Sequence, residues 1–229
     1  MYGRENTRLR LDQEAKIQAE KLEKWMACVP GYESFWAFCL VKKGYSGVVT
    51  YVKEELSPLD AKADYLGDLD SDSDIDLCRE GRLMETDHGS FILINVYVPN
   101  EGQSAEVCPR LFFKLHFLKT LKHRCDDIVN SGKEVVVMGD FNIAHKDIDI
   151  YNDWSIHDIY TQDEISWIDN FFPEIMWICF GISIQMQEMY FQIGIQRRKQ
   201  EYIMRDLGEH VLIWILKRQC IKLSSASWC

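Results

Sequence analysis

Two short apolar runs, at residues 91–98 and 135–138, are the clearest hydrophobic pattern in this chain. Continuous apolar and β-branched runs of this length are typical of strands that are buried on both faces. Between the two runs, apolar residues recur at helical spacing from Pro109, a residue type that favours the first turn of a helix. A strand, a helix and a second strand in this order predict two parallel neighbouring strands. Their polar ends, at Tyr97 and Asp140, should then lie together at the carboxyl edge of the sheet.

The chain before these strands predicts a helix and a hairpin. Residues 1–12 contain no apolar run of strand length, so we expect a loose start. From Gln13 onward, apolar residues recur at helical spacing, at Ile17, Leu22, Trp25 and Met26. Two apolar, β-rich runs at residues 34–40 and 48–52 flank a lysine- and glycine-rich turn, which indicates two antiparallel strands.

A polar, acidic segment runs from Pro58 to Cys78. It contains aspartates at every second position from residue 70 to residue 76. That alternation invites comparison with a calcium-binding loop, but no frame places glycine sixth and glutamate twelfth. We therefore expect a solvated insertion loop.

Composition indicates one globular α/β domain. The chain has 229 residues, and its eight cysteines are scattered without a C-x-x-C pair, which is typical of reduced thiols. The formal net charge of −10 argues against a broadly basic nucleic-acid-binding protein. It does not exclude a metal-dependent nuclease, because a cation neutralises the acidic site of such an enzyme.

The end of the second apolar run carries the candidate chemistry. Asp140 and Asn142 alternate with Phe141, so both polar side chains can point to one side of the strand. A carboxylate beside an amide suits a hard divalent cation, or a water molecule that must be oriented and deprotonated. A strand that simply ends in an Asp/Asn-rich turn would show the same residues. From these few residues alone, both interpretations stay open.

The run from Gly139 to His145 reads G-D-F-N-I-A-H, and Ile148-Asp149 follows it. This stretch resembles the signature of the exonuclease III type of apurinic/apyrimidinic (AP) endonuclease, in the endonuclease/exonuclease/phosphatase superfamily. Within that type, the chain resembles the AP endonuclease 2 branch. Shorter stretches resemble motifs of the same family: Q-E-A-K from Gln13, G-Y-S-G-V from Gly44, I-N-V-Y-V-P-N from Ile94, R-L-F-F-K from Arg110 and the helix that contains W-I-D from Trp167.

The resemblance implies a fold and a set of roles. The fold would be an α/β (α+β) sandwich of four layers, two β-sheets flanked by helices, here incomplete. Asp140 would deprotonate the attacking water, and Asn142 would orient that water or hold the metal. Glu14 would bind Mg²⁺ together with Asp140 and Asn142, with Mn²⁺ as the alternative ion, and Tyr97 would steady the phosphate. Without the motifs, a solvated position for Glu14 and an amphipathic position at the edge of the core for Tyr97 are the simpler interpretations.

The same resemblance implies a DNA repair nuclease of the nucleus that acts in base excision repair. Its substrate would be DNA with abasic sites or blocked 3′ ends, and it would work as a monomer without a membrane. Two rival hypotheses remain: another phosphodiesterase or phosphatase of the superfamily, such as a phosphoinositide phosphatase or a deadenylase, and a non-catalytic truncated product.

The resemblance covers residues 13–174 as a partial domain, and the tail at residues 175–229 diverges from it. No N-x-N-G motif precedes Gln13, and neither G-S-R-[IL]-D nor S-D-H follows, so we expect at most feeble activity and low stability. The apolar start of the tail is interrupted by glutamine and glutamate before a membrane span accumulates. Met and Trp have single codons, so a shifted frame must read Val from Met176-Trp177 and Asp from Trp177-Ile178. That Val-Asp falls where the family has its own Asp, so we expect the tail to be out of frame.

Overall fold

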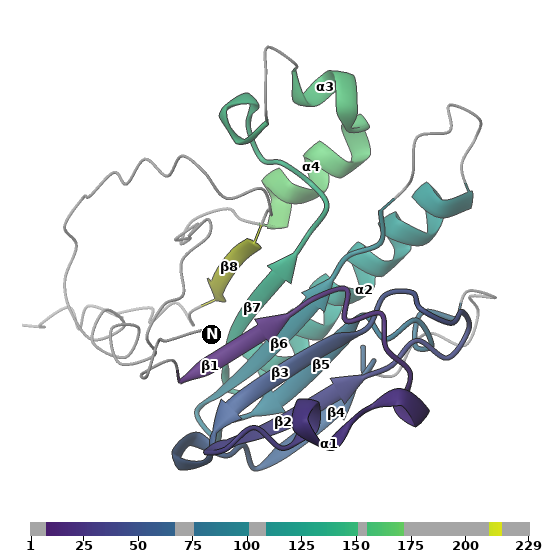
Figure 1. Cartoon of the computed structure of the whole chain (residues 1–229). Coiled ribbons are helices and arrows are strands. Elements are labelled where there is room, and N and C mark those ends of the chain that lie inside the picture. Colours follow the sequence, from purple (N-terminus) through teal and green to yellow (C-terminus); the bar gives the residue numbers. More distant parts are fainter. Residues whose placement is uncertain (1–7, 67–75, 101–108, 151–154, 172–210, 217–229) are drawn as a thin grey trace, which may run out of the picture.

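The computed structural model describes residues 8–66, 76–100, 109–150, 155–171 and 211–216, which form two β-sheets and their covering helices (Figure 1). The first sheet has the strand order β1-β3-β2, made of β1 (Leu9–Asp12), β2 (Tyr32–Ala37) and β3 (Val48–Lys53). The second has the order β4-β5-β6-β7-β8, made of β4 (Asp60–Ala63), β5 (Leu83–Asp87), β6 (Phe91–Tyr97), β7 (Glu134–Asp140) and β8 (Val211–Leu216). The two sheets confirm the predicted α/β sandwich.

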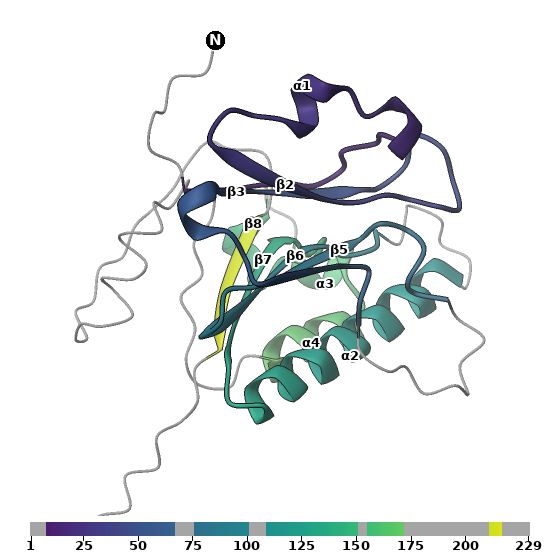
Figure 2. The ribbon, with the colours of Figure 1, turned by 90° about the horizontal axis from the view of Figure 1, so that it is seen from below.

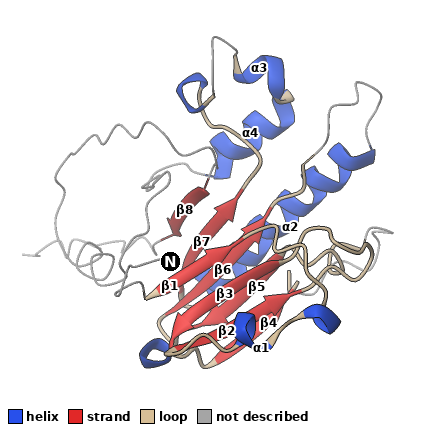
Figure 3. Ribbon diagram, viewed as in Figure 1, coloured by secondary structure: helices blue, strands red, loops and turns tan. Residues whose placement is uncertain are grey.

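The helices lie outside the sheets (Figures 2 and 3). They are α1 (Lys24–Ala27), α2 (Pro109–Asn130), α3 (Ile156–Ile159) and α4 (Gln162–Phe171), with 3₁₀ turns η1 (Ala19–Lys21), η2 (Glu54–Leu56) and η3 (Asp147–Asp149). In Figure 2, α2 and α4 lie on one side of the five-stranded sheet, the three-stranded sheet lies on the other, and α1 lies beyond it. Within the described ranges, no helix has the length and apolar character that crossing a bilayer requires.

Strand β6 is the centre of the core. Its alternate residues Ile92, Ile94 and Val96 pack with α2 and α4, whereas Phe91 and Leu93 face the three-stranded sheet. Every residue of the strand is buried. Complete burial of each such aliphatic side chain contributes roughly 1.5–3 kcal/mol, so this strand is a main source of the stability of the fold.

The predicted strand–helix–strand unit is confirmed. The 22-residue helix α2 crosses from β6 to β7, and these two strands pair in parallel. One side of α2 buries Phe117, Leu118 and Leu121 against the five-stranded sheet. The hairpin of β2 and β3 is confirmed as well, because these strands pair antiparallel.

Three short strands differ from the sequence expectation. Residues 9–12, expected to be part of a loose start, form β1 on the edge of β3. Residues 60–63, expected to belong to a solvated loop, form β4 on the edge of β5, and β5 itself had no apolar run to indicate it. Each of these strands depends on pairing with a neighbour, which a local hydrophobic pattern does not encode. The alternating aspartates of the insertion lie outside the described residues, apart from Asp76.

The helix expected from Gln13 to Met26 is wrong. Only η1 and α1 are helical there, and Glu14 and Lys16 have positive φ angles of 53° and 50°. The amides of Ala15 and Lys16 donate to the carbonyl oxygens of residues 47 and 46, at 2.9 and 2.8 Å. Hydrogen bonds that a helix would form within itself are therefore made to the turn between β2 and β3.

The divergent tail contributes one described element. Strand β8 pairs antiparallel with β7, from Val135 opposite Leu216 to Asp140 opposite Val211. This pairing covers the edge of β7 that β6 leaves open, so part of the tail joins the sheet. The rest of residues 175–229 lies outside the described residues.

Candidate active site

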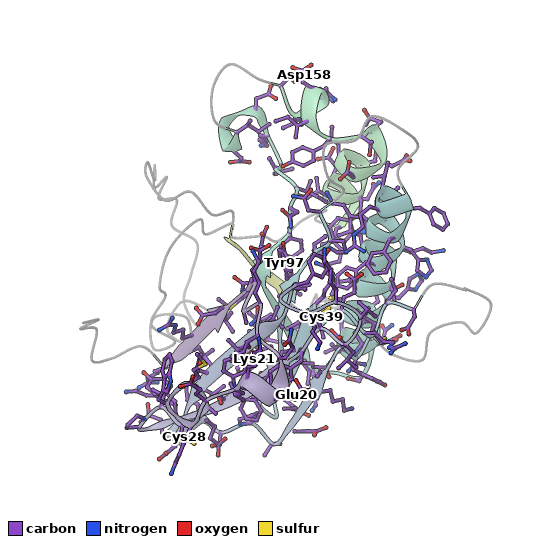
Figure 4. The ribbon with its side chains drawn as sticks, turned by 45° about the vertical axis from the view of Figure 1, so that its right-hand side comes forward. Glu20, Lys21, Cys28, Cys39, Tyr97 and Asp158 are labelled. Carbon is purple, nitrogen blue, oxygen red and sulfur yellow. The ribbon has the colours of Figure 1, made fainter. Side chains whose placement is uncertain are left out.

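The site lies at the carboxyl ends of β6 and β7. Tyr97 and Asp140 are partners in the parallel register, and the Val98 amide donates to the Asp140 carbonyl oxygen at 2.8 Å. Figure 4 shows Tyr97 toward the end of the sheets that faces α3, with Cys28 at the opposite end. The edge predicted from sequence therefore brings these two side-chain positions together.

A tight turn after β7 places Asn142 beside Asp140. Asn142 has a φ angle of 50°, and its amide nitrogen donates to Asp140 Oδ1 at 2.8 Å. Its side-chain Nδ2 donates to the Val98 carbonyl oxygen at 2.8 Å, and its Oδ1 accepts from Asn100 Nδ2 at 3.3 Å. The nitrogen and the oxygen of the Asn142 side-chain amide are thus both oriented by the segment that follows β6.

Glu14 reaches the site from the first sheet. Glu14 Oε1 accepts a hydrogen bond from the Tyr97 hydroxyl, and Glu14 Oε2 lies 2.8 Å from Lys16 Nζ. The hydrogen bonds from Lys16 and then from Tyr97 lower the pKa of Glu14, so this side chain is a carboxylate at neutral pH. The loop that carries Glu14 is held by the turn at residues 44–47, described above.

Tyr97 is a protonated phenol at neutral pH. Burial, followed by the hydrogen bond to Glu14, raises the pKa of Tyr97 well above its ordinary value. The negative charge of Asp140 raises this pKa as well. Tyr97 is therefore a hydrogen-bond donor, and Glu14 accepts from it.

Arg82 lies beneath Tyr97, and sequence reasoning missed it. Its side chain is only 1% exposed, and its guanidinium carbon lies 4.8 Å from the centroid of the Tyr97 ring. Nη1 donates to the Tyr97 carbonyl oxygen at 3.1 Å, Nε donates to Glu80 at 2.6 Å, and Nη2 donates to the Tyr45 hydroxyl at 2.9 Å. A buried guanidinium thus contacts both the ring and the backbone of Tyr97, and its positive charge favours the carboxylate form of Glu14.

Glu80 forms ion pairs with two arginines. Besides Arg82, it accepts from Arg110 Nη1 and Nη2, at 2.8 and 2.6 Å. Burial alone would raise the pKa of Glu80, but hydrogen bonds from Arg110 and Arg82 outweigh it and lower that pKa. The sequence signal was the E-G-R triplet: at Gly81 a Cβ would lie 2.5 Å from the Phe38 backbone, so glycine allows this approach.

A buried amide connects the two sheets next to the site. Asn95 Nδ2 donates to the Val49 carbonyl oxygen at 3.0 Å and to Thr50 Oγ1 at 3.2 Å. Asn95 Oδ1 accepts from Gln13 Nε2 at 2.7 Å. Gln13 directly precedes Glu14. Its hydrogen bond to Asn95 on β6 therefore fixes the start of the loop that carries Glu14.

The donor atoms suit a hard divalent cation. Glu14, which accepts from Tyr97, and Asp140, the register partner of Tyr97, supply carboxylate oxygens, and Asn142 supplies an amide oxygen. Mg²⁺ is commonly held by one or two carboxylates and completes its shell with water, and Mn²⁺ accepts the same donors. In the part of the chain that the structure describes, no cluster of three or more His, Cys, Asp or Glu side chains forms a fuller cage. Because Glu14, Asp140 and Asn142 offer only three side-chain donors, an ion bound by them would keep positions for water and substrate.

The two packed sheets and their outer helices define the fold class as an α/β sandwich. The acidic side chains at the carboxyl edge of its larger sheet are of the kind that hydrolases use. Residues 5–180 match the model of the endonuclease/exonuclease/phosphatase family. This match covers more than half of the chain, so the chain belongs to that family. The match begins before Gln13, in agreement with the presence of β1.

Several curated proteins are similar in sequence. Human DNA-(apurinic or apyrimidinic site) endonuclease 2 is 29% identical over 183 residues, which cover 69% of this chain and 35% of the human protein. Its mouse counterpart is 30% identical over 182 residues, with the same coverage. Recombination repair protein 1 of Drosophila melanogaster is 32% identical over 141 residues, or 61% of this chain and 18% of that protein. The chain thus spans about a third of the length of the AP endonuclease 2 relatives that it matches.

Two solved structures are similar in fold. The catalytic domain of APE2 from Xenopus laevis has a TM-score of 0.62 at 25% identity, over 72% of this chain and 59% of that chain. An AP endonuclease from Archaeoglobus fulgidus has a TM-score of 0.57 at 18% identity, over 90% of this chain and 76% of that chain. The second likeness concerns the fold alone.

Proposed function

We propose that this domain is a metal-dependent DNA repair nuclease that hydrolyses phosphodiesters at abasic sites or at blocked 3′ ends. The observation that carries the proposal is the meeting of Glu14, Tyr97 and Asp140 at one sheet edge, two acidic groups around one phenol. Relatives described as DNA-(apurinic or apyrimidinic site) endonuclease 2 support DNA as the substrate.

Each side chain has a role in this proposal. Asp140 accepts the proton of the attacking water, and the Asn142 amide orients that water or contributes a metal ligand. Tyr97 donates a hydrogen bond to a phosphate oxygen once substrate replaces its contact with Glu14. Glu14, Asp140 and Asn142 would hold Mg²⁺, or Mn²⁺ in its place, and the bound ion would supply positive charge to the phosphate.

The proposal includes a cellular setting and a domain division. The protein would act in base excision repair in the nucleus, as a monomer on DNA. Residues 13–174 would form the catalytic domain, and residues 175–229 would be a divergent tail read out of frame.

Strand cleavage tests the function directly. A labelled duplex with one tetrahydrofuran abasic analogue is incubated with the protein in Mg²⁺, in Mn²⁺ and in EDTA, beside an undamaged duplex of the same sequence. We expect nicking of the abasic duplex that requires the metal and is abolished by EDTA. Equal cleavage of both duplexes would contradict damage recognition, and cleavage in EDTA would contradict the metal.

An inactive protein would count against the proposal for this chain. To separate inactivity from unfolding, circular dichroism and thermal melting are recorded on the same preparation. A folded protein that releases phosphate from a phosphoinositide but leaves both duplexes intact would place the chain in another branch of the family.

A further inference from the structure

A fully buried ion pair connects α2 and α4 behind the candidate site. Lys114 on α2 and Glu164 on α4 form a salt bridge, with side chains 1% and 0% exposed. Burial of two charges costs much of what their attraction contributes, so this pair is weak evidence for stability alone. The other contacts of the pair indicate a role beside the candidate site.

Lys114 also donates a hydrogen bond to the backbone of the site. Its Nζ lies 2.9 Å from the carbonyl oxygen of Asn142, the residue whose amide nitrogen donates to Asp140 Oδ1. Asn142 has a φ angle of 50°, a left-handed conformation that is unfavourable for residues other than glycine. A charged donor on its carbonyl group therefore stabilises a turn that would otherwise relax.

Glu164 orients Lys114 from the other side. Glu164 Oε2 accepts from both the amide nitrogen and the hydroxyl of Thr161, each at 2.8 Å, at the first turn of α4. The Tyr160 ring, with its centroid 5.4 Å from Lys114 Nζ, covers the ammonium group. The carboxylate and the ring fix the ammonium group from two sides, and its remaining direction is toward Asn142.

We propose that Lys114 and Glu164 are positioning residues of the active site. They hold the Asn142 carbonyl group and, through it, the backbone N–H of Asn142 that orients the Asp140 carboxylate. Because the pair is buried behind the site, its loss should affect the rate of the chemical step and leave DNA binding unchanged. This inference rests on the proposed nuclease function, but the backbone contact can be tested without activity.

The test uses the double variant Lys114→Met with Glu164→Gln. Loss of one partner would leave a buried charge and could unfold the protein, whereas loss of both charges avoids that penalty. Glutamine keeps an oxygen that can accept from Thr161, and methionine keeps the apolar length of lysine. The matched control is Lys122→Met with Asp126→Asn, which neutralises an exposed ion pair on the same helix.

Nuclear magnetic resonance can detect the contact between Lys114 and the Asn142 carbonyl group. Asn142-Ile143 is the only Asn-Ile step in the sequence. Carbonyl-¹³C asparagine combined with ¹⁵N isoleucine therefore yields a single signal from this peptide bond. We expect this signal to shift in the double variant and to stay in place in the control, because only the former loses the donor to the Asn142 carbonyl. An unmoved signal in the folded double variant would overturn the inference.

Steady-state kinetics measures the effect of the double variant on catalysis. We expect kcat for abasic-site nicking to fall about 10- to 100-fold in the double variant, the range for loss of a hydrogen bond from a charged donor, with KM unchanged. Lys114→Arg, which keeps a charged donor, should recover most of that rate. A shifted signal with unchanged kcat, or a rise in KM alone, would overturn the positioning role. A wild-type protein without nicking would refute the proposed function, and the carbonyl signal would still decide the contact.

Discussion

Tyr97 and Asp140 are neighbours in the parallel register of β6 and β7, although 42 residues of sequence separate them. The crossover through α2 brings them together, because a parallel pair needs a long connection that returns to the same end of the sheet. Glu14 then reaches Tyr97 from the other sheet. The site therefore depends on the packing of the two sheets as well as on β6 and β7.

In a full-length version of this protein, Asp140→Asn should remove most nicking activity and leave the fold intact. The amide keeps the shape of the side chain and can still accept from the Asn142 amide nitrogen, but it cannot take a proton from water. We expect the rate to fall by about 10²- to 10⁴-fold, the range for loss of a catalytic base. The measurement is initial nicking rate beside the thermal midpoint. Asp126→Asn, on the exposed part of α2, is the control, and unchanged turnover in Asp140→Asn would rule out the proposed role.

Glu80→Gln should destabilise the protein in a pH-dependent way. The pKa of Glu80 in the folded protein lies below the ordinary value of 4.5, so its charge contributes stability at pH above that value. This contribution is lost as the pH falls through the lowered pKa. At pH 7 we expect the variant to lose about 1–3 kcal/mol of unfolding free energy, because two arginines lose a charged acceptor.

Urea unfolding at pH 7 and at successively lower pH tests this prediction. The difference in unfolding free energy between wild type and Glu80→Gln should shrink as the pH falls below 4.5. Glu33→Gln, an exposed change on β2, serves as the control for loss of a carboxylate. A difference that stays constant with pH would show that the Glu80 charge is not the cause.

Gly139→Ala should strongly destabilise the domain. A Cβ at this position would lie 1.8 Å from the Val96 carbonyl oxygen, so β6 and β7 would have to separate beside the site. We expect a loss of roughly 3 kcal/mol or more in unfolding free energy. Gly44→Ala is the matched control: it also has a positive φ angle, but open space surrounds it, so about 1 kcal/mol is expected. Equal losses in the two variants would contradict the steric explanation.

We predict that residues after about Ile175 are read in a frame different from that of the related proteins. The alternative frame must give Val from Met176-Trp177 and Asp from Trp177-Ile178, and this Asp falls where the family pattern has its own Asp. Sequencing the transcript and the gene across the codons for Phe172 to Trp177 is the measurement. We expect a stop-free alternative frame that continues the family pattern; stop codons there, or unrelated residues, would contradict it.

Local sequence was sufficient for the central unit of the fold. The apolar runs of β6 and β7 predicted strands that are buried on both faces, and the side chains of β6 do contact core on one face or the other. The spacing along α2 predicted its apolar face. The G-D-F-N run predicted Asp140 and Asn142 as a pair from the period of two of a strand. In the structure β7 ends at Asp140, and a turn with Asn142 at a φ angle of 50° places the two residues together.

Tertiary contacts decided the rest. The segment after Gln13 has helical spacing but forms a loop, because its amides bond to the turn between β2 and β3. Short strands such as β1 and β4 exist through pairing with their neighbours. Arg82 and Lys114 would each be read as solvated charges from sequence alone, yet both are buried. Arg82 pairs with its near neighbour Glu80 but also contacts the distant Tyr45, and Lys114 on α2 pairs with Glu164 on α4. Only the folded chain brings these distant partners together in a buried site.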